Sequence, residues 1–171
     1  MRDVNTVFIG GPFKGMIDPE TGSIIPEYRY RYELLTAFFT QAGWLVHNAH
    51  RSEGWGLNTV SDRACTERDF QWMHDCDLFI AFPGSPASPG THVEIGWATA
   101  MAKPMILLLE ATVSYAALVT GLSSIALIEY VRFFDLDKAL TDISTAVDSL
   151  ARATGASWAL SPVSGGTHGR S

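Results

Sequence analysis

The chain has 171 residues, which is enough for one domain with a proper hydrophobic core and too few for two typical domains. Hydrophobic residues make up 47% of it and charged residues 18%, a composition that is typical of a globular protein and excludes a disordered one. The formal net charge of −6 argues against binding to nucleic acids, which requires a basic surface.

Cysteine content and apolar runs bear on where the protein works. Cys65 and Cys76 are the only cysteines, and their spacing matches no metal site, so we expect reduced thiols. No apolar run approaches the ~20 residues that span a bilayer. The N-terminus lacks the apolar segment of a signal peptide. We therefore expect a cytoplasmic protein that binds no membrane, no metal and no other cofactor.

The first predicted strand, residues 4–10, runs directly into a glycine-rich segment, residues 10–15. Paired glycines at a strand end, here Gly10 and Gly11, indicate a place where the backbone closely approaches a ligand. The segment has neither the Gly-x-Gly-x-x-Gly dinucleotide fingerprint nor the Gly-Lys-Ser/Thr of a Walker loop. As a phosphate motif taken alone it is weak. Residues 16–27 follow as a long loop.

The next predicted elements are a helix over residues 28–42, closed by Gly43, and a short strand over residues 44–48. The strand opens into a polar loop, residues 49–56. Loops at the carboxyl ends of strands bind ligands in open α/β sheets. The alternative, which we weight equally, is a solvated loop whose aromatic residues have no role in binding. The side chains in question are His50, Arg51 and Trp55.

A helix is predicted from its capping residue Ser61 to about Asp75. Asp69 lies on this helix and is an ordinary surface acid by composition alone. It gains interest because it precedes the third strand by only one or two helical turns, close to that strand's loops.

The most informative stretch is a predicted strand over residues 78–82, a turn-rich segment over residues 83–90, and a helical pattern from Thr91 onward. This order of elements is the geometry of an anion site, because free N–H groups and the positive end of the helix dipole face the loop. Ser88 adds a hydroxyl donor, and Gly90 allows close approach of the backbone to a ligand.

Glu94 has two interpretations at this point. A carboxylate one turn inside such a helix makes chemical sense if it attacks the ligand some distance from the ligand's phosphate. The alternative is structural, because Thr91-x-x-Glu94 is a capping box in which Glu94 only bonds the Thr91 N–H. The motif alone favours neither.

The remaining predicted elements are a strand over 104–109, a short helix over 111–119, a strand over 126–131 and a helix over 135–153. Strands and helices therefore alternate five times, which predicts a single doubly wound α/β domain, Rossmann-like or flavodoxin-like, with a five-stranded parallel sheet. We assign residues 1–154 to this domain and residues 155–171 to a flexible C-terminal tail. Right-handed crossovers would bring the glycine-rich loops and Glu94 to one sheet edge.

Several of these segments match one family of enzymes. The matching segments are residues 10–13, 48–51, 55–56, Asp69 eight residues before Asp77, and residues 81–84 and 88–98. With them the sequence resembles the nucleoside 2-deoxyribosyltransferase superfamily from about Val7 to about Phe133. Within it, the sequence is most similar to the nucleotide N-glycosidase branch, the CMP and hydroxymethyl-CMP hydrolases of nucleoside-antibiotic pathways.

The resemblance implies an activity and roles for individual residues. It implies hydrolysis of CMP or 5-hydroxymethyl-CMP, with Glu94 as the nucleophile at the anomeric carbon and Asp69 as a proton-handling or orienting partner. The implied 5′-phosphate site is Gly11, Ser88, Gly90 and Thr91. The implied sugar and base contacts are Phe8, Gly10, Phe13, Lys14, His50, Arg51 and Trp55. The resemblance also implies a homodimer with a shared active site, to which residues 114–117 of the partner would contribute.

Two positions differ from relatives. Deoxynucleotide-specific relatives carry a tyrosine where this chain has Phe8, and the missing hydroxyl fits a ribonucleotide substrate. Lys14 stands where the branch often has arginine, which leaves its contact to phosphate or base open. We also expect a subunit contact that involves four aromatic residues, Tyr28, Tyr30, Tyr32 and Tyr115.

Three alternatives stay open from the sequence. A purine nucleotide phosphoribohydrolase of the cytokinin-activating type has a related loop, but with a double glycine that this chain lacks. A nucleoside 2-deoxyribosyltransferase would move the sugar to another base. A non-catalytic nucleotide-binding module has no need for carboxylates near a phosphate, so Asp69 and Glu94 argue against it.

Overall fold

The computed structural model describes residues 4–158 and 160. A five-stranded sheet forms its centre, with all neighbouring strands parallel and in the order β2-β1-β3-β4-β5. The predicted α/β class and the parallel sheet are thus confirmed. The strands are β1 (Thr6–Gly10), β2 (Leu45–Asn48), β3 (Leu78–Ala81), β4 (Met105–Glu110) and β5 (Ile128–Phe133).

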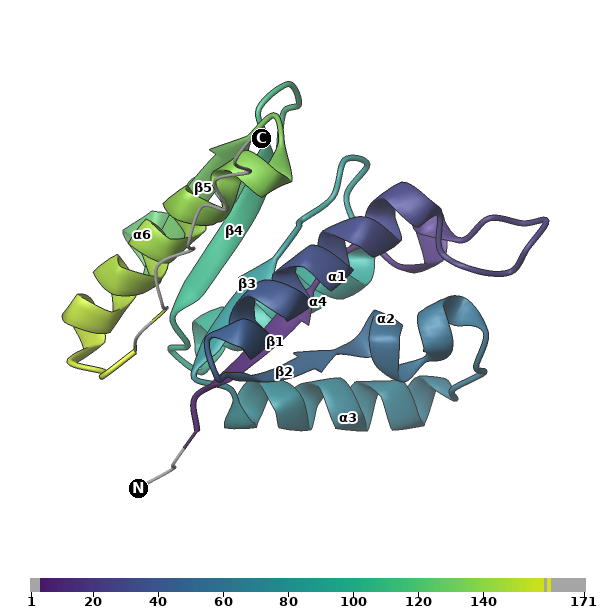
Figure 1. Ribbon diagram of the computed structural model, residues 1–171, viewed down its shortest axis with the longest axis horizontal. Coiled ribbons are helices and arrows are strands. Elements are labelled where there is room, and N and C mark those ends of the chain that lie inside the picture. Colours follow the sequence, from purple (N-terminus) through teal and green to yellow (C-terminus); the bar gives the residue numbers. More distant parts are fainter. Residues whose placement is uncertain (1–3, 159, 161–171) are drawn as a thin grey trace, which may run out of the picture.

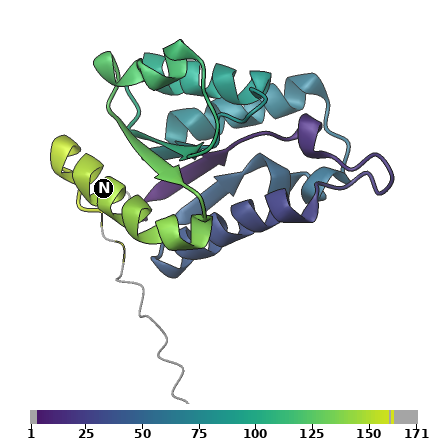
Figure 2. The ribbon, with the colours of Figure 1, turned by 90° about the horizontal axis from the view of Figure 1, so that it is seen from above.

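Helices cover both faces of this sheet (Figures 1 and 2). On one face lie the long helices α1 and α6, and on the other α3 and α4. The helices are α1 (Pro26–Gln41), α2 (Ala49–Ser52), α3 (Asp62–Asp75), α4 (Pro89–Ala100), α5 (Ala117–Thr120) and α6 (Leu136–Thr154). Short 3-10 turns occur at η1 (Lys14–Met16), η2 (Gly54–Gly56) and η3 (Leu122–Ser124).

Strand burial follows from this layering. All residues of β1 and β3 are buried, as expected for strands covered on both faces. Side chains alternate between two cores: Val7 and Ile9 face the α1/α6 layer, whereas Phe8 faces the α3/α4 layer. Apolar burial on both faces therefore fixes the register of the central strands.

The strand order places a switch point between β1 and β3. The chain leaves β1 toward β2 on one side and leaves β3 toward β4 on the other, which opens a crevice at the carboxyl ends of β1 and β3. The two loops meet there. A Cβ added at Gly84 would lie 2.7 Å from Cγ of Pro12, and Gly84 has a φ of +87°, so only glycine suits this contact.

Several element boundaries differ from the sequence prediction, among them β5, which was predicted over 126–131. Helix α4 begins at Pro89 rather than Thr91, because proline fits the first helical position and Ser88 accepts a hydrogen bond from the Thr91 N–H. The loop after β2 contains the helical turns α2 and η2, the first capped by the Asn48 side chain. Only the end of the helix predicted over residues 111–119 is helical, as α5.

The predicted tail lies partly outside the described residues, which exclude residues 1–3, 159 and 161–171. Of the part that is described, Trp158 packs edge-on against Trp44, with ring centroids 5.7 Å apart, and Leu160 packs against the same core. Within the described residues, no helix combines the length and the apolar character needed to cross a membrane.

Candidate active site

A cavity of about 600 Å³ lies at the carboxyl edge of the sheet, over the switch point between β1 and β3. Four segments form its wall: the end of β1 with the loop that follows, the turn after β2, the first half of α3, and the loop that leads into α4. Of the residues predicted for the site, ten line the cavity: Gly10, Gly11, Phe13, Lys14, His50, Asp69, Ser88, Gly90, Thr91 and Glu94.

Glu94 lies on α4 but does not cap it. Ser88 is the N-cap, and its hydroxyl accepts a hydrogen bond from the Thr91 N–H at 3.4 Å. Thr91 is therefore the third helical residue and not the capping residue. Glu94 is the sixth helical residue, one turn too late to bond the free N–H groups of the helix start. The capping-box interpretation of Thr91 and Glu94 is therefore wrong.

The Glu94 carboxyl group is half-buried in the cavity wall, and no donor within the described residues forms a hydrogen bond with it. Burial, together with the nearby Asp69 carboxylate, raises its pKa from 4.5 to about 8, and the Arg68 guanidinium opposes this rise. An acidic group that is sheltered yet unpaired in a cavity is a candidate for catalysis.

Gly10 permits this position of Glu94. A Cβ added at Gly10 would lie 2.7 Å from Oε2 of Glu94 and 2.9 Å from the ring of Phe79. Any other residue would displace the carboxylate, so the glycine at the end of β1 is a requirement of the site.

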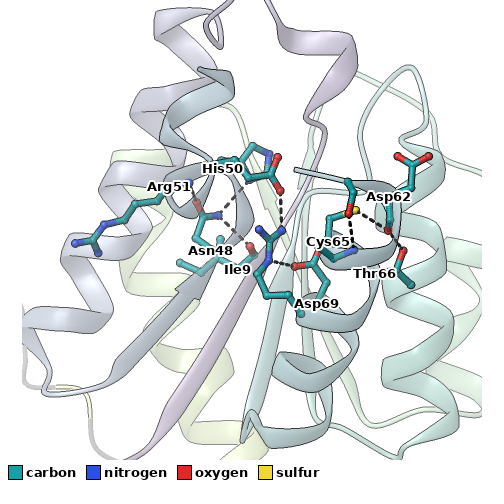
Figure 3. A network of polar contacts seen from close by, with 12 residues as sticks. Ile9, Asn48, His50, Arg51, Asp62, Cys65, Thr66 and Asp69 are labelled. Atoms are coloured by element: carbon teal, nitrogen blue, oxygen red, sulfur yellow. Dashed lines mark hydrogen bonds and ion pairs between the residues drawn. The ribbon is translucent and has the colours of Figure 1, made fainter. Parts of the chain in front are cut away.

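Asp69 lines the same cavity and belongs to a charge network that is sheltered from water (Figure 3). The Arg68 Nε donates to Asp69 at 2.8 Å, and its Nη2 donates to Glu53 at 2.7 Å. Burial raises the pKa of Asp69, while the hydrogen bond from Arg68 lowers it. The Asp69 carboxylate contributes to the raised pKa of Glu94, so the ionisation of Glu94 depends on Asp69.

The N-terminus of α4 forms part of the cavity wall. The Thr91 hydroxyl donates to the Ser88 hydroxyl at 2.9 Å, which orients both at the first turn of the helix. A Cβ added at Gly90 would meet no protein atom within 4 Å, so there is open space beside this backbone. In the first turn Pro89 has no N–H, and the Thr91 and His92 N–H groups bond Ser88, so the Gly90 N–H is left without a partner among the described residues. This N–H and the dipole of a twelve-residue helix favour an anionic ligand there.

His50 supports the glycine-rich loop. Its Nε2 donates to the Pro12 carbonyl at 2.9 Å, and its Nδ1 accepts from the Asn48 amide at 3.3 Å. The Tyr32 hydroxyl donates to the same carbonyl at 2.9 Å, and the Tyr32 and His50 rings stack at 3.9 Å. Burial lowers the pKa of His50 to about 4, so the ring is neutral at physiological pH. His50 borders the cavity, but protein partners occupy both ring nitrogens.

Three predicted contacts are not brought to the cavity wall: Phe8, Arg51 and Trp55. Phe8 is fully buried beneath the site, where its ring packs against Phe79 and Trp72. The Arg51 side chain is exposed and points away from Asp69 and Asn48 (Figure 3). The Trp55 carbonyl accepts from the Ile24 N–H at 2.8 Å, so this residue secures the loop before α1.

Phe13 and Lys14 form the loop side of the cavity. Phe13 packs edge-on against His50, with ring centroids 4.6 Å apart, and Lys14 is exposed. Within the described part of the chain, no group of three or more His, Cys, Asp or Glu side chains is arranged to hold a metal ion.

The sequence prediction missed three residues that shape the site: Tyr32, Glu53 and Arg68. Tyr32 was assigned to packing or a subunit contact, and Glu53 and Arg68 follow no recognisable spacing. The one available signal was the adjacency of Arg68 to Asp69, and adjacent helical residues normally do not face each other.

Comparisons with known proteins agree on one family. The model of the nucleoside 2-deoxyribosyltransferase family matches residues 25–151. The chain is 38% identical to BlsM, with a TM-score of 0.78 over 95% of this chain and 98% of that one. It is 35% identical to the CMP N-glycosidase BcmB of Clostridium botulinum, with a TM-score of 0.64 over 82% of this chain and 99% of that one. A search of curated proteins found no significant match.

Replacing Glu94 by glutamine should stabilise the fold at alkaline pH. Because the folded state raises the pKa of Glu94 from 4.5 to about 8, wild-type stability falls as the pH rises between these values. Glutamine keeps the shape and cannot ionise. Melting temperatures at pH 4.5 and pH 8.5 should show a gain for Glu94→Gln that grows with pH, about 2–4 °C for each kcal/mol relieved.

The matched control is Glu33→Gln, which removes an exposed carboxylate on α1. It should show no comparable gain at high pH. A Glu94→Gln protein that melts below wild type at pH 8.5 would mean that the carboxylate stabilises the fold, which contradicts the environment described above.

Proposed function

The chain belongs to the nucleoside 2-deoxyribosyltransferase family, and we propose that it is a nucleotide N-glycosidase that hydrolyses CMP or 5-hydroxymethyl-CMP to the free base and ribose 5-phosphate. One observation carries the proposal. The unpaired Glu94 carboxylate and the N-terminus of α4 line the same cavity, which suits attack on a sugar whose phosphate is bound at the helix.

In the first step, the ionised Glu94 carboxylate attacks C1′ of the ribose as the bond from C1′ to the base nitrogen breaks. The bonding electrons leave with the base, and a proton from the Asp69 carboxyl group makes it a better leaving group. The transition state resembles an oxocarbenium ion, which the negative charge of Glu94 stabilises. Water then attacks C1′ of the Glu94 ester, releases ribose 5-phosphate and restores both carboxyl groups.

The titration of the carboxyl pair supports these roles. Burial raises the pKa of both carboxyl groups, and a neighbouring acid adds to the rise in each case: Asp69 for Glu94, and Glu53 for Asp69. In the free protein the proton resides on Glu94, whose pKa is about 8, because Asp69 is paired with Arg68. Positive charge that develops at C1′ favours the ionised form of Glu94, so this proton passes to Asp69 before it reaches the base. Such pairs allow one carboxyl group to act as an acid while its neighbour acts as a nucleophile.

The substrate phosphate is assigned to the N-terminus of α4. The Gly90 N–H, which has no partner among the described residues, and the hydroxyl of Ser88 offer donors to a dianion, and the helix dipole adds attraction. With a net charge of −6, the chain as a whole would repel a nucleotide, so this local site has to supply the binding energy.

The choice of CMP rests on similarity to a CMP N-glycosidase rather than on a contact to the base. The sequence argument for a ribonucleotide depended on Phe8, and this side chain packs beneath the cavity instead of lining it. A tyrosine there would still place its hydroxyl between Trp72 and Phe79 unless the rings moved. A nucleoside-antibiotic pathway is the setting that the resemblance favours.

CMP should be hydrolysed far faster than cytidine by the purified protein. Without the phosphate, the binding energy at α4 is unavailable to position C1′ against Glu94, so kcat/KM should fall by at least about 100-fold. Release of free base, measured for both compounds at equal concentration, tests this. Equal turnover of CMP and cytidine would contradict the phosphate assignment.

The same assay separates the alternatives when it is extended to other substrates. Preference for AMP over CMP would favour a purine nucleotide phosphoribohydrolase. Sugar transfer from dCMP to an added base, faster than release to water, would favour a nucleoside 2-deoxyribosyltransferase. Tight binding of nucleotides without release of base would indicate a non-catalytic binding module.

We also propose that the protein acts as a homodimer. Tyr32 is only 1% exposed and cannot take part in a subunit contact, whereas Tyr30 is 49% exposed. Exposed apolar side chains on other helices support self-association instead, among them Phe70 on α3, Val93 on α4 and Leu118 on α5. Sedimentation at micromolar concentration should give the dimer mass. A fully active monomer would contradict a shared site.

A further inference from the structure

Four carboxylates line one cavity, and a single guanidinium forms ion pairs with two of them. Glu53, Asp62, Asp69 and Glu94 all line the cavity wall. Arg68 does not line it, yet it forms ion pairs with Glu53 at 2.7 Å and with Asp69 at 2.8 Å. Arg68 is therefore bonded to two acids of the cavity wall but does not line the cavity itself, so it can act on the site without touching a ligand.

The Arg68 network is sheltered from water. The side chains of Glu53, Arg68 and Asp69 are 13%, 19% and 15% exposed. A second ion pair on the same helix, Arg63 with Glu67, has the same length of 2.8 Å but is 86% and 64% exposed. Exposed pairs contribute little, whereas sheltered charges are screened less and interact more strongly.

The guanidinium also joins two parts of the fold. Glu53 follows α2, in the turn after β2, and Asp69 lies in the middle of α3. The planar face of Arg68 lies over the Trp72 ring at 4.8 Å, which restricts its orientation. Arginine can donate to two carboxylates at once from fixed positions, whereas a lysine ammonium is a single point charge.

On the basis of the function proposed above, we infer that Arg68 is a positioning residue: it holds Asp69 beside Glu94 and provides the positive charge that lets both carboxylates share the cavity. The groups that act on this pair are Glu53 and Arg68 on the Asp69 side and Tyr32 on the Glu94 side. Of these only Arg68 is cationic. Its removal would leave Glu53 and Asp69 without their ion-pair partner, and Asp69 would be free to rotate.

Kinetics of two variants test this role. Arg68→Met keeps an unbranched stem against Trp72 and removes the charge, and kcat for CMP should fall by about 100-fold, the cost of a misplaced catalytic group. KM should change less than threefold, because Arg68 does not line the cavity. Arg68→Lys should recover part of kcat. The matched control Arg63→Met should match wild type.

A second measurement needs no substrate. The side-chain carboxyl carbon of Glu94 can be followed by carbon-13 NMR as the pH is varied. Because a nearby guanidinium favours the ionised carboxylate, the Glu94 midpoint should move to higher pH in Arg68→Met and stay in place in Arg63→Met. Should Arg68→Met fail to fold, Arg68→Lys carries the test with a smaller shift.

The outcomes separate this inference from the proposed function. If wild type releases no base from any nucleotide, the proposed function fails, and the NMR titration still decides whether Arg68 controls the carboxyl pair. An unchanged Glu94 midpoint in Arg68→Met overturns the inference. So does an unchanged kcat, or a loss of activity that lies entirely in KM.

Discussion

The close approach of Glu94 to the end of β1 is the contact on which the site depends. Gly10 leaves room for the carboxylate, and the start of α4 at Pro89 sets how far along the helix it lies. Parallel strands deliver both elements to one edge, because the strand order switches between β1 and β3. The N-terminal end of α4 and the Glu94 carboxylate are therefore fixed relative to each other by a single rigid helix.

Electrostatics explain why this arrangement is confined to a small region. Burial of an unpaired carboxyl group lowers the stability of the folded state, and a neighbouring acid adds to that cost. The rest of the fold tolerates this loss of stability, since β1 and β3 are buried on both faces and carry no ionisable group. A buried carboxyl group with a raised pKa at one cavity, next to an apolar core, is the pattern expected of an active site.

Sequence reasoning predicted the sheet, its parallel strands and the cavity position, because apolar runs separated by turn residues carry that information. It considered Thr91 as the capping residue, three positions after the actual N-cap Ser88, so Glu94 kept two interpretations. Arg68 and Tyr32 were missed because their roles arise from contacts with distant segments. Trp55 was misplaced for the same reason, since its carbonyl bonds Ile24.

The most direct test of the account is to trap the sugar on Glu94. A CMP analogue with fluorine at C2′ destabilises the oxocarbenium-like state, so hydrolysis of the glycosyl ester should become slow enough to observe. The intact protein should then gain the mass of one fluorosugar phosphate, on the peptide that contains Glu94, and Glu94→Gln should gain none. A label on another residue, or the same label on Glu94→Gln, would contradict the assignment of Glu94 as nucleophile.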